Sequence, residues 1–234
     1  MSDNPKLQTD AVALIKFFSR EEHYLSFKKG TNLFRTPHYY RKDKSIGRGD
    51  RSESCLGYWD KTLGNEMPNI IYNGDKVNFD DAQSLLIYPA AEQKDAWLQS
   101  WAVIGPHNDF ENSLEQMLNE FGTYFVILPA TKIIAYKHLL AKTSGCKVNM
   151  GEVRYSDDPL ERSLVVKDSK FSYQKEFRFF LGECSKDEKR DKKIQLQGLN
   201  KMLLEASTLK LASPSGEVKY CSLGHQKVVS THKN

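Results

Sequence analysis

The sequence predicts an α+β fold: a single domain with a mainly antiparallel sheet and flanking helices. Short apolar segments recur through the middle of the chain and are separated by turn signals such as Asn73-Gly74-Asp75. Two longer segments instead carry apolar residues at helical spacing. The length of 234 residues suits one large domain. We therefore expect the domain to span residues 1–222, followed by a frayed tail at 223–234.

The first 35 residues are expected to contain a helix and a strand. Residues 10–20 predict the helix, capped by Thr9 or Asp10, because their apolar positions share one helical face: Ala11, Leu14, Ile15 and Phe18. A turn at residues 29–32 follows, and a strand is expected at residues 33–35.

A proline then interrupts the chain. Pro37 disfavours a helix through Thr36, so we expect a turn there and a short helix at residues 38–40. Residues 43–57 are polar and rich in glycine. This composition predicts a surface loop.

The remaining residues predict further strands and both long helices. Turn-bounded apolar segments indicate strands near residues 69–72, 84–88, 96–104, 124–128, 146–155, 164–166 and 173–182. Amphipathic segments indicate helices at residues 110–121 and 130–143. The first of these helices is expected to bury Leu114, Met117, Leu118 and Phe121. A last strand pair, residues 209–212 and 218–222, flanks a turn at residues 213–216.

Composition limits the classes of partner and compartment. The net charge of +4 is compatible with nucleic acid or nucleotide partners but does not require them. The four cysteines lie far apart, without a CxxC pair, which argues against a zinc site and a disulfide scaffold. Residues 1–10 lack the basic and apolar regions that are typical of a signal peptide, and no apolar run approaches the roughly 18 residues that span a bilayer. We expect a cytoplasmic protein that does not engage a membrane.

Three segments combine polar side chains with an expected strand. The first is the stretch from Arg35 to Tyr40, and the second is Gln99-Ser100 within an aromatic strand. The third is FSYQKEFRFF, residues 171–180. Strict alternation along this strand would place an amide, an acid and a guanidinium on one face, namely Gln174, Glu176 and Arg178. Such a face is either solvated or part of a cleft.

A guanidinium, a hydroxyl and a carboxylate on three separate strands are suited to cleaving a nucleotide cofactor. The cation holds a phosphate, and the hydroxyl supports the acid. The acid binds a ribose hydroxyl and stabilises an oxocarbenium-like transition state. Nearby aromatic rings stack on a flat heterocycle.

The order of Arg35, Ser100 and a Gln-x-Glu ending in Glu176 resembles the R–S–E pattern of ADP-ribosyltransferases. The resemblance implies a split antiparallel sheet around NAD, which is the substrate, and no metal. It implies that Ser100 braces Glu176, which drives cleavage of the nicotinamide–ribose bond, while Gln174 orients the acceptor. NAD would be held by Arg35, Thr36, His38, Tyr39 and Tyr40. The usual serine-threonine-serine strand is replaced here by Gln99-Ser100-Trp101.

A second resemblance covers roughly residues 30–180. The segments FRTPHYYRKDKSIGRGDRSES and YQKEFRF are similar to those of an uncharacterised group of bacterial proteins. Several relatives of that kind sit among phage-defence and toxin–antitoxin genes. This resemblance implies a toxin or effector, with an antitoxin or chaperone as its natural partner.

The acceptor and the chemistry each leave alternatives. Arg41, Arg48 and Arg51 in the predicted loop are expected to bind a macromolecular acceptor, with RNA or DNA favoured over an acidic protein. One alternative is a nucleic-acid-directed toxin of other chemistry, such as a metal-independent nuclease. Another is a non-enzymatic binding module of a defence or toxin–antitoxin system, in which Glu176 and Arg178 form an ordinary charge ladder.

Overall fold

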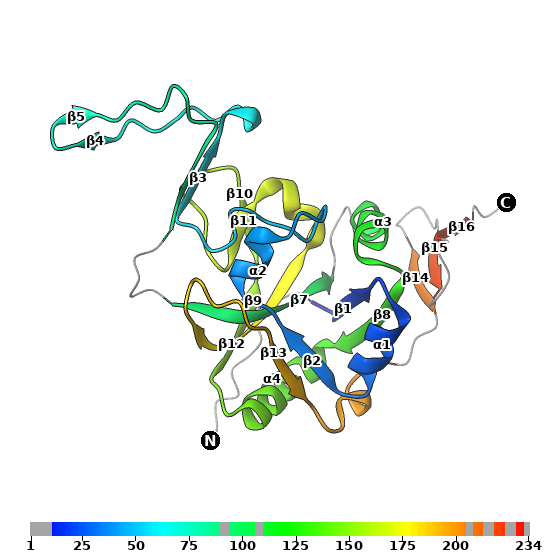
Figure 1. Ribbon diagram of the computed structural model, residues 1–234. Coiled ribbons are helices and arrows are strands. Elements are labelled where there is room, and N and C mark those ends of the chain that lie inside the picture. Colours follow the sequence, from blue (N-terminus) through cyan, green and yellow to red (C-terminus); the bar gives the residue numbers. More distant parts are fainter. Residues whose placement is uncertain are drawn as a thin grey trace, which may run out of the picture.

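A five-stranded antiparallel sheet lies at the centre of the computed structural model, which describes residues 11–88, 94–105, 110–204, 208–212, 218–222 and 228–231 (Figure 1). Its strand order is β8-β1-β7-β12-β9. The strands are β1 (Ala13–Phe18), β7 (Asp95–Ile104), β8 (Tyr124–Pro129), β9 (Val148–Glu152) and β12 (Glu176–Cys184). The predicted α+β class with a mainly antiparallel sheet is therefore confirmed.

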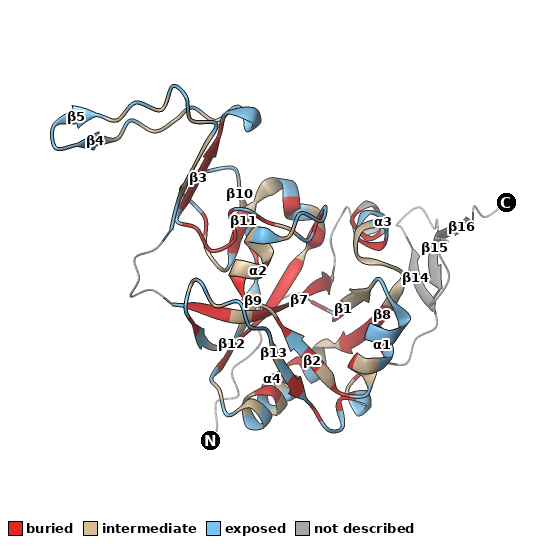
Figure 2. Cartoon of the chain, viewed as in Figure 1, coloured by how far each residue is buried: buried red, intermediate tan, exposed pale blue. Residues whose placement is uncertain are grey.

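Helices cover both faces of this sheet. The helices are α1 (Glu21–Lys28), α2 (Pro37–Lys42), α3 (Phe110–Phe121) and α4 (Ala130–Ser144). One core packs α4 against Trp101, Phe177 and Phe179, and the other packs α3 against Ile15, Ala102 and Phe125. Leu114, Met117 and Leu118 are buried as predicted, and Phe121 packs beside them. Figure 2 shows the buried residues concentrated in these central strands.

The sheet forks between β1 and β7. The two strands pair from Ala13↔Ile104 to Ile15↔Ala102, whereas β1 stays paired with β8 as far as Phe18. Beyond the fork, β7 bonds instead to Arg35, whose N–H donates to the Leu98 carbonyl at 3.0 Å. Arg35 directly follows β2 (Thr31–Phe34), which pairs with β13 (Lys192–Gln195). The divergence of β1 from β7 leaves space between two well-anchored strands.

A two-stranded arm projects from the body (Figure 1). It begins with β3 (Gly57–Asp60) paired to β6 (Ser84–Ile87) and ends in the hairpin of β4 (Ile71–Tyr72) and β5 (Asp75–Lys76). The short helix η1 (Lys61–Leu63) follows β3. Ile71 and Tyr72 at the tip are 67% and 70% exposed. The arm therefore adds little to either core.

The remaining elements are short. Strand β10 (Arg154–Ser156) pairs in parallel with β11 (Val166–Asp168). Two short 3₁₀ helices are η2 (Ser169–Gln174) and η3 (Leu199–Lys201). A separate antiparallel sheet comprises β14 (Thr208–Ala212), β15 (Val218–Ser222) and β16 (Val228–Thr231). Within the described residues, no helix is long and apolar enough to cross a membrane.

The helix predicted for residues 10–20 is wrong, because this segment contains β1. Leu14 packs into the α4 core and Ile15 into the α3 core, so successive residues are buried on opposite faces. A strand buried on both faces loses its alternation, and its apolar residues then coincide with helical spacing. The helix of this region, α1, begins only at Glu21.

The predicted loop at residues 43–57 is only partly a surface loop. Asp50, Ser52, Glu53, Ser54 and Cys55 are buried. Composition alone does not predict this burial, because the buried carboxylate of Glu53 pairs with Arg178, which is 125 residues away in the sequence.

The strand predicted at residues 173–182 begins later, at Glu176. Gln174 instead ends η2, and Lys175 adopts a left-handed backbone with φ 44°. Strict alternation therefore does not extend to Gln174, and the prediction that it shares a strand face with Glu176 is wrong.

Most other predicted elements are confirmed, with small shifts at their ends. The strands at residues 84–88, 96–104 and 124–128 correspond to β6, β7 and β8. The segment at residues 146–155 contains two strands, β9 and β10. The C-terminal pair corresponds to β14 and β15, while the turn at residues 213–216 lies outside the described residues. Strand β16 lies within the tail expected to fray.

Candidate functional site

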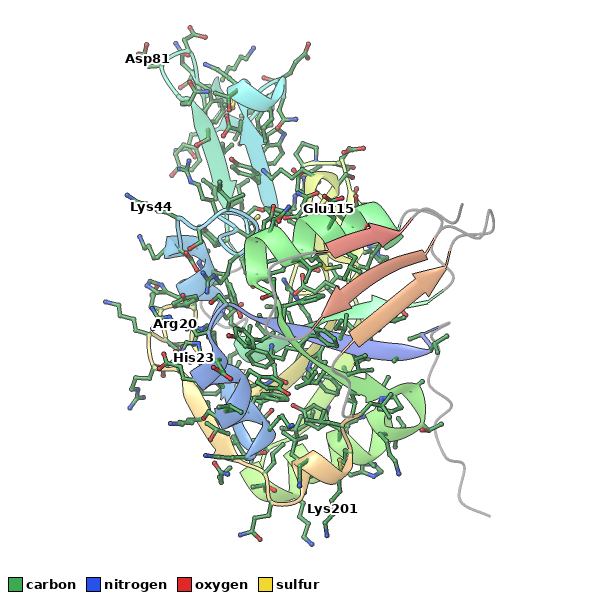
Figure 3. All side chains as sticks on the ribbon, turned by 90° about the vertical axis from the view of Figure 1, so that its right-hand side faces the viewer. Arg20, His23, Lys44, Asp81, Glu115 and Lys201 are labelled. Carbon is green, nitrogen blue, oxygen red and sulfur yellow. The ribbon has the colours of Figure 1, made fainter. Side chains whose placement is uncertain are left out.

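A cavity of about 690 Å³ opens at the fork between β1 and β7. Arg35, Ser100, Gln174 and Glu176, which are far apart in the sequence, all line it. The first turn of α1 also contributes, through His23 and the preceding Arg20 (Figure 3). The cavity therefore joins all three polar segments identified from the sequence.

Lys16 bridges the fork. Its Nζ donates to the Ser100 carbonyl oxygen at 2.8 Å, just beyond the last paired residues, Ile15 and Ala102. A buried carbonyl that loses its ladder partner needs another donor. The Lys16 amine supplies one, so β1 and β7 can separate without leaving this carbonyl unsatisfied.

Glu176 lies at the start of β12 and is buried between two cations. Its Oε2 accepts from Lys167 Nζ at 3.1 Å and its Oε1 accepts from Arg178 Nε at 2.7 Å. Lys167 also donates to the Gln174 Oε1 at 2.9 Å, while the Gln174 Nε2 donates to the Gly47 carbonyl at 2.6 Å. Gln174 thus reaches the site through a turn rather than along a strand.

Arg178 is fully buried and forms hydrogen bonds with two carboxylates of the site. Its two terminal nitrogens donate to both oxygens of Glu53, at 2.6 and 2.8 Å. The guanidinium also donates to the Leu164 carbonyl at 2.6 Å. Glu53 and Glu176 together balance Arg178 and Lys167, so the buried group is neutral as a whole.

The charge state of Glu176 follows from these neighbours. Burial by itself would raise the pKa of Glu176, but the charges of Arg178 and Lys167 outweigh it. A hydrogen bond from Ser100 adds to the lowering. The pKa therefore lies well below the ordinary value of 4.5, and Glu176 is ionised at neutral pH.

Arg35 is held at the cavity wall by contacts on two sides. Its backbone bonds to Leu98, and its guanidinium carbon lies 3.7 Å from the centroid of the Tyr39 ring. The guanidinium also forms an ion pair with Asp191 at 3.9 Å. The guanidinium is therefore oriented and only loosely paired, which leaves it able to bind an anion.

The other residues predicted to hold the cofactor are distributed unevenly. Tyr40 lines the cavity, whereas Thr36, His38 and Tyr39 are outside its lining. Thr36 instead caps α2 by accepting from the Tyr39 N–H at 3.2 Å.

The three predicted acceptor-binding arginines also differ in position. Arg48 lines the cavity and pairs with Asp43 at 3.3 Å. Arg41 is engaged within the fold, donating to the carbonyls of Glu53 at 3.0 Å and Lys186 at 2.7 Å. Arg51 is exposed and outside the cavity lining.

The sequence interpretation missed Lys16, Glu53 and Lys167. Lys16 is the one charged residue in the apolar run ALIKFF, and a charge within such a strand is a signal of function. Glu53 lies in a polar loop, and nothing local distinguishes it from its neighbours. Only the fold brings it to Arg178, which is 125 residues away.

The lining of the cavity favours an anionic ligand. Three glutamates face seven lysines and arginines, namely Lys16, Arg20, Arg35, Arg48, Lys167, Arg178 and Lys193. Aromatic side chains, among them Phe18, Tyr40 and Trp101, also contribute to the wall. Among the described residues, no group of three or more His, Cys, Asp or Glu could hold a metal ion. Comparisons with protein families, curated proteins and solved structures yield no match for this chain.

The buried charges predict that Arg178→Met will strongly destabilise the protein. The substitution leaves Glu53 and Glu176 without their shared cation, a type of change that costs about 3–5 kcal/mol. The matched control is Arg190→Met, because Arg190 forms an exposed pair with Glu188 and should contribute little. Denaturant unfolding of both variants measures the difference, and equal small effects would contradict the assigned role of Arg178.

The lowered pKa of Glu176 predicts a specific pH dependence. The ionised carboxylate stabilises the fold above pH 4.5, and this contribution is lost as pH falls below 4.5 toward the folded-state value. The stability difference between the wild type and Glu176→Gln should therefore shrink on acidification. Denaturant unfolding at about pH 7 and about pH 3.5 tests this, with the exposed Glu183→Gln as control. A constant difference would show that Glu176 is not a low-pKa group.

Proposed function

We propose that this chain is an ADP-ribosyltransferase that cleaves NAD and transfers ADP-ribose to a nucleic acid. The observation that carries the proposal is the convergence of Arg35, Ser100 and Glu176 on one cavity. These are the residues that the resemblance to ADP-ribosyltransferases selects. The fork between β1 and β7, at the mouth of the cavity, supports the split sheet that the same resemblance implies.

The size and charge of the cavity support a dinucleotide as its ligand. Its volume of about 690 Å³ lies within the range of nucleotide and cofactor sites. Arg35 and Arg48 are suited to binding the pyrophosphate, and the Tyr40 ring provides an aromatic wall.

Glu176 is assigned the chemical step. Its carboxylate binds a ribose hydroxyl and stabilises the cationic transition state that forms as nicotinamide leaves. Ser100 and Arg178 orient it, through the hydrogen bonds that also keep it ionised. Gln174 borders the same space and is assigned to orient the acceptor, which requires its contact with Gly47 to open.

The acceptor class follows from charge. Exposed cations at the cavity, including Arg20, Arg48 and Lys193, suit a phosphate backbone better than an acidic protein surface that offers scattered carboxylates. The likeness to defence-associated bacterial proteins supports a role as a toxin or effector, with an antitoxin or chaperone as partner.

One observation favours a second candidate, a non-enzymatic nucleotide-binding module. Both oxygens of Glu176 already accept from Lys167 and Arg178. A carboxylate that is fully paired in this way can serve structure alone. The binding module predicts that NAD binds without any release of nicotinamide.

The chemical step is tested by measuring nicotinamide release and transfer of labelled ADP-ribose to single-stranded DNA or RNA. Glu176→Gln keeps the shape but removes the charge, and should lower release by roughly 10²-fold or more. Glu183→Gln, an exposed substitution, should match the wild type. Circular dichroism establishes that both variants are folded. Normal turnover by Glu176→Gln would overturn the assignment, and cleavage of nucleic acid without NAD would support a nuclease instead.

Cofactor binding is tested by thermal unfolding in millimolar NAD. NAD should raise the melting temperature of the wild type by mass action, by an amount equivalent to about 2.7 kcal/mol at a hundred times Kd. Arg35→Ala should abolish the shift, whereas Arg154→Ala, outside the cavity lining, should retain it. An unshifted wild type would contradict the proposed substrate.

A further inference from the structure

Lys16 is a desolvated amine on the wall of the cavity. Its Nζ donates to the Ser100 carbonyl at 2.8 Å. It lies 5.9 Å from the centroid of the Trp101 ring and 6.0 Å from that of Phe18. The amine therefore has a backbone carbonyl and two aromatic rings as close neighbours, and the Lys16 residue is only partly exposed.

The other two lysines of the cavity differ from Lys16. Lys167 forms an ion pair with Glu176 at 3.1 Å. Lys193 is exposed at the cavity rim. Lys16, within the described part of the chain, forms neither a salt bridge nor a hydrogen bond to a carboxylate. It is therefore the cavity lysine with the least support for its positive charge.

The electrostatic surroundings agree with this geometry. Burial lowers the pKa of Lys16 to about 8, and the charge of Arg35 lowers it further, while Glu176 acts in the opposite direction. A substantial fraction of the amine is therefore unprotonated just above neutral pH. Unprotonated lysines in such surroundings are nucleophiles toward carbonyl groups.

We propose that Lys16 forms a Schiff base with phosphorylated aldoses that enter the cavity. The Nζ lone pair attacks the aldehyde carbon of the open-chain sugar, a carbon–nitrogen double bond replaces the carbon–oxygen bond, and the oxygen leaves as water with two protons from the amine. The cations along the cavity, among them Arg35 and Arg48, hold the phosphate.

This inference does not depend on cleavage of NAD, because the aldose is supplied directly. It also bears on the proposed function. Free ADP-ribose, the hydrolysis product of NAD, is itself a phosphorylated aldose and falls within the ligand class. A Lys16 adduct would then occupy the space that the next NAD requires.

The experiment uses the full chain with ribose 5-phosphate and cyanoborohydride, which reduces the imine to a stable amine. Peptide mass mapping then locates the adduct. Lys16 should carry at least about tenfold more adduct than Lys193, and unphosphorylated ribose should label it far less. Lys16→Met should lose the adduct, whereas Lys193→Met should keep it. Melting temperatures establish that both variants are folded.

The inference is overturned if the adduct is spread evenly over exposed lysines, or if ribose labels Lys16 as well as ribose 5-phosphate does. Lys16→Arg guards against a folding defect in Lys16→Met, because it keeps a donor for the Ser100 carbonyl but has no reactive amine. An adduct on Lys16 in a chain that releases no nicotinamide would uphold this inference and refute the proposed transferase.

Discussion

The guanidinium of Arg178, buried between Glu53 and Glu176, is the interaction on which the rest of the site depends. A buried cation without carboxylates would cost several kcal/mol, so the fold must deliver both acids to it. Bringing Glu53 there places Asp50 and residues 52–55 in the interior, just before the arm begins at Gly57. The same guanidinium fixes the Glu176 carboxylate at the end of the cavity. Stability and the orientation of the candidate acid therefore share one cause.

The fork in the sheet is the second constraint, and it explains the reactivity inferred for Lys16. The separation of β1 from β7 creates the cavity, but it leaves the Ser100 carbonyl without a backbone hydrogen-bond partner in β1. The donor that satisfies this carbonyl is Lys16, which reaches it from the opposite side of the gap and lies beside Trp101. Burial of this amine lowers its pKa. The contact that satisfies the Ser100 carbonyl thus also places the Lys16 amine at the cavity.

Residue types in the sequence predicted the candidate site, although the reason given for the position of Gln174 was wrong. Arg35, Ser100 and Glu176 meet at the cavity because each lies at or beside a strand that joins the central sheet. Gln174 is also there, but the left-handed Lys175 ends the strand alternation that predicted its position. A turn brings its amide to the site instead, and hydrogen bonds with Lys167 and Gly47 hold that amide.

The sequence by itself determined α3, α4 and most strands of the central sheet, because apolar periodicity is a local property that each segment carries alone. The tertiary structure decided the rest. Strand β1 resembles a helix in sequence, since both of its faces are buried against different helices. Lys16 and Ser100 lie 84 residues apart, and Glu53 and Arg178 lie 125 apart. Such pairs form because a buried charge or carbonyl that has lost its water needs a new partner. Only the complete fold determines which residue is close enough to be that partner, so no local sequence pattern predicts the pair.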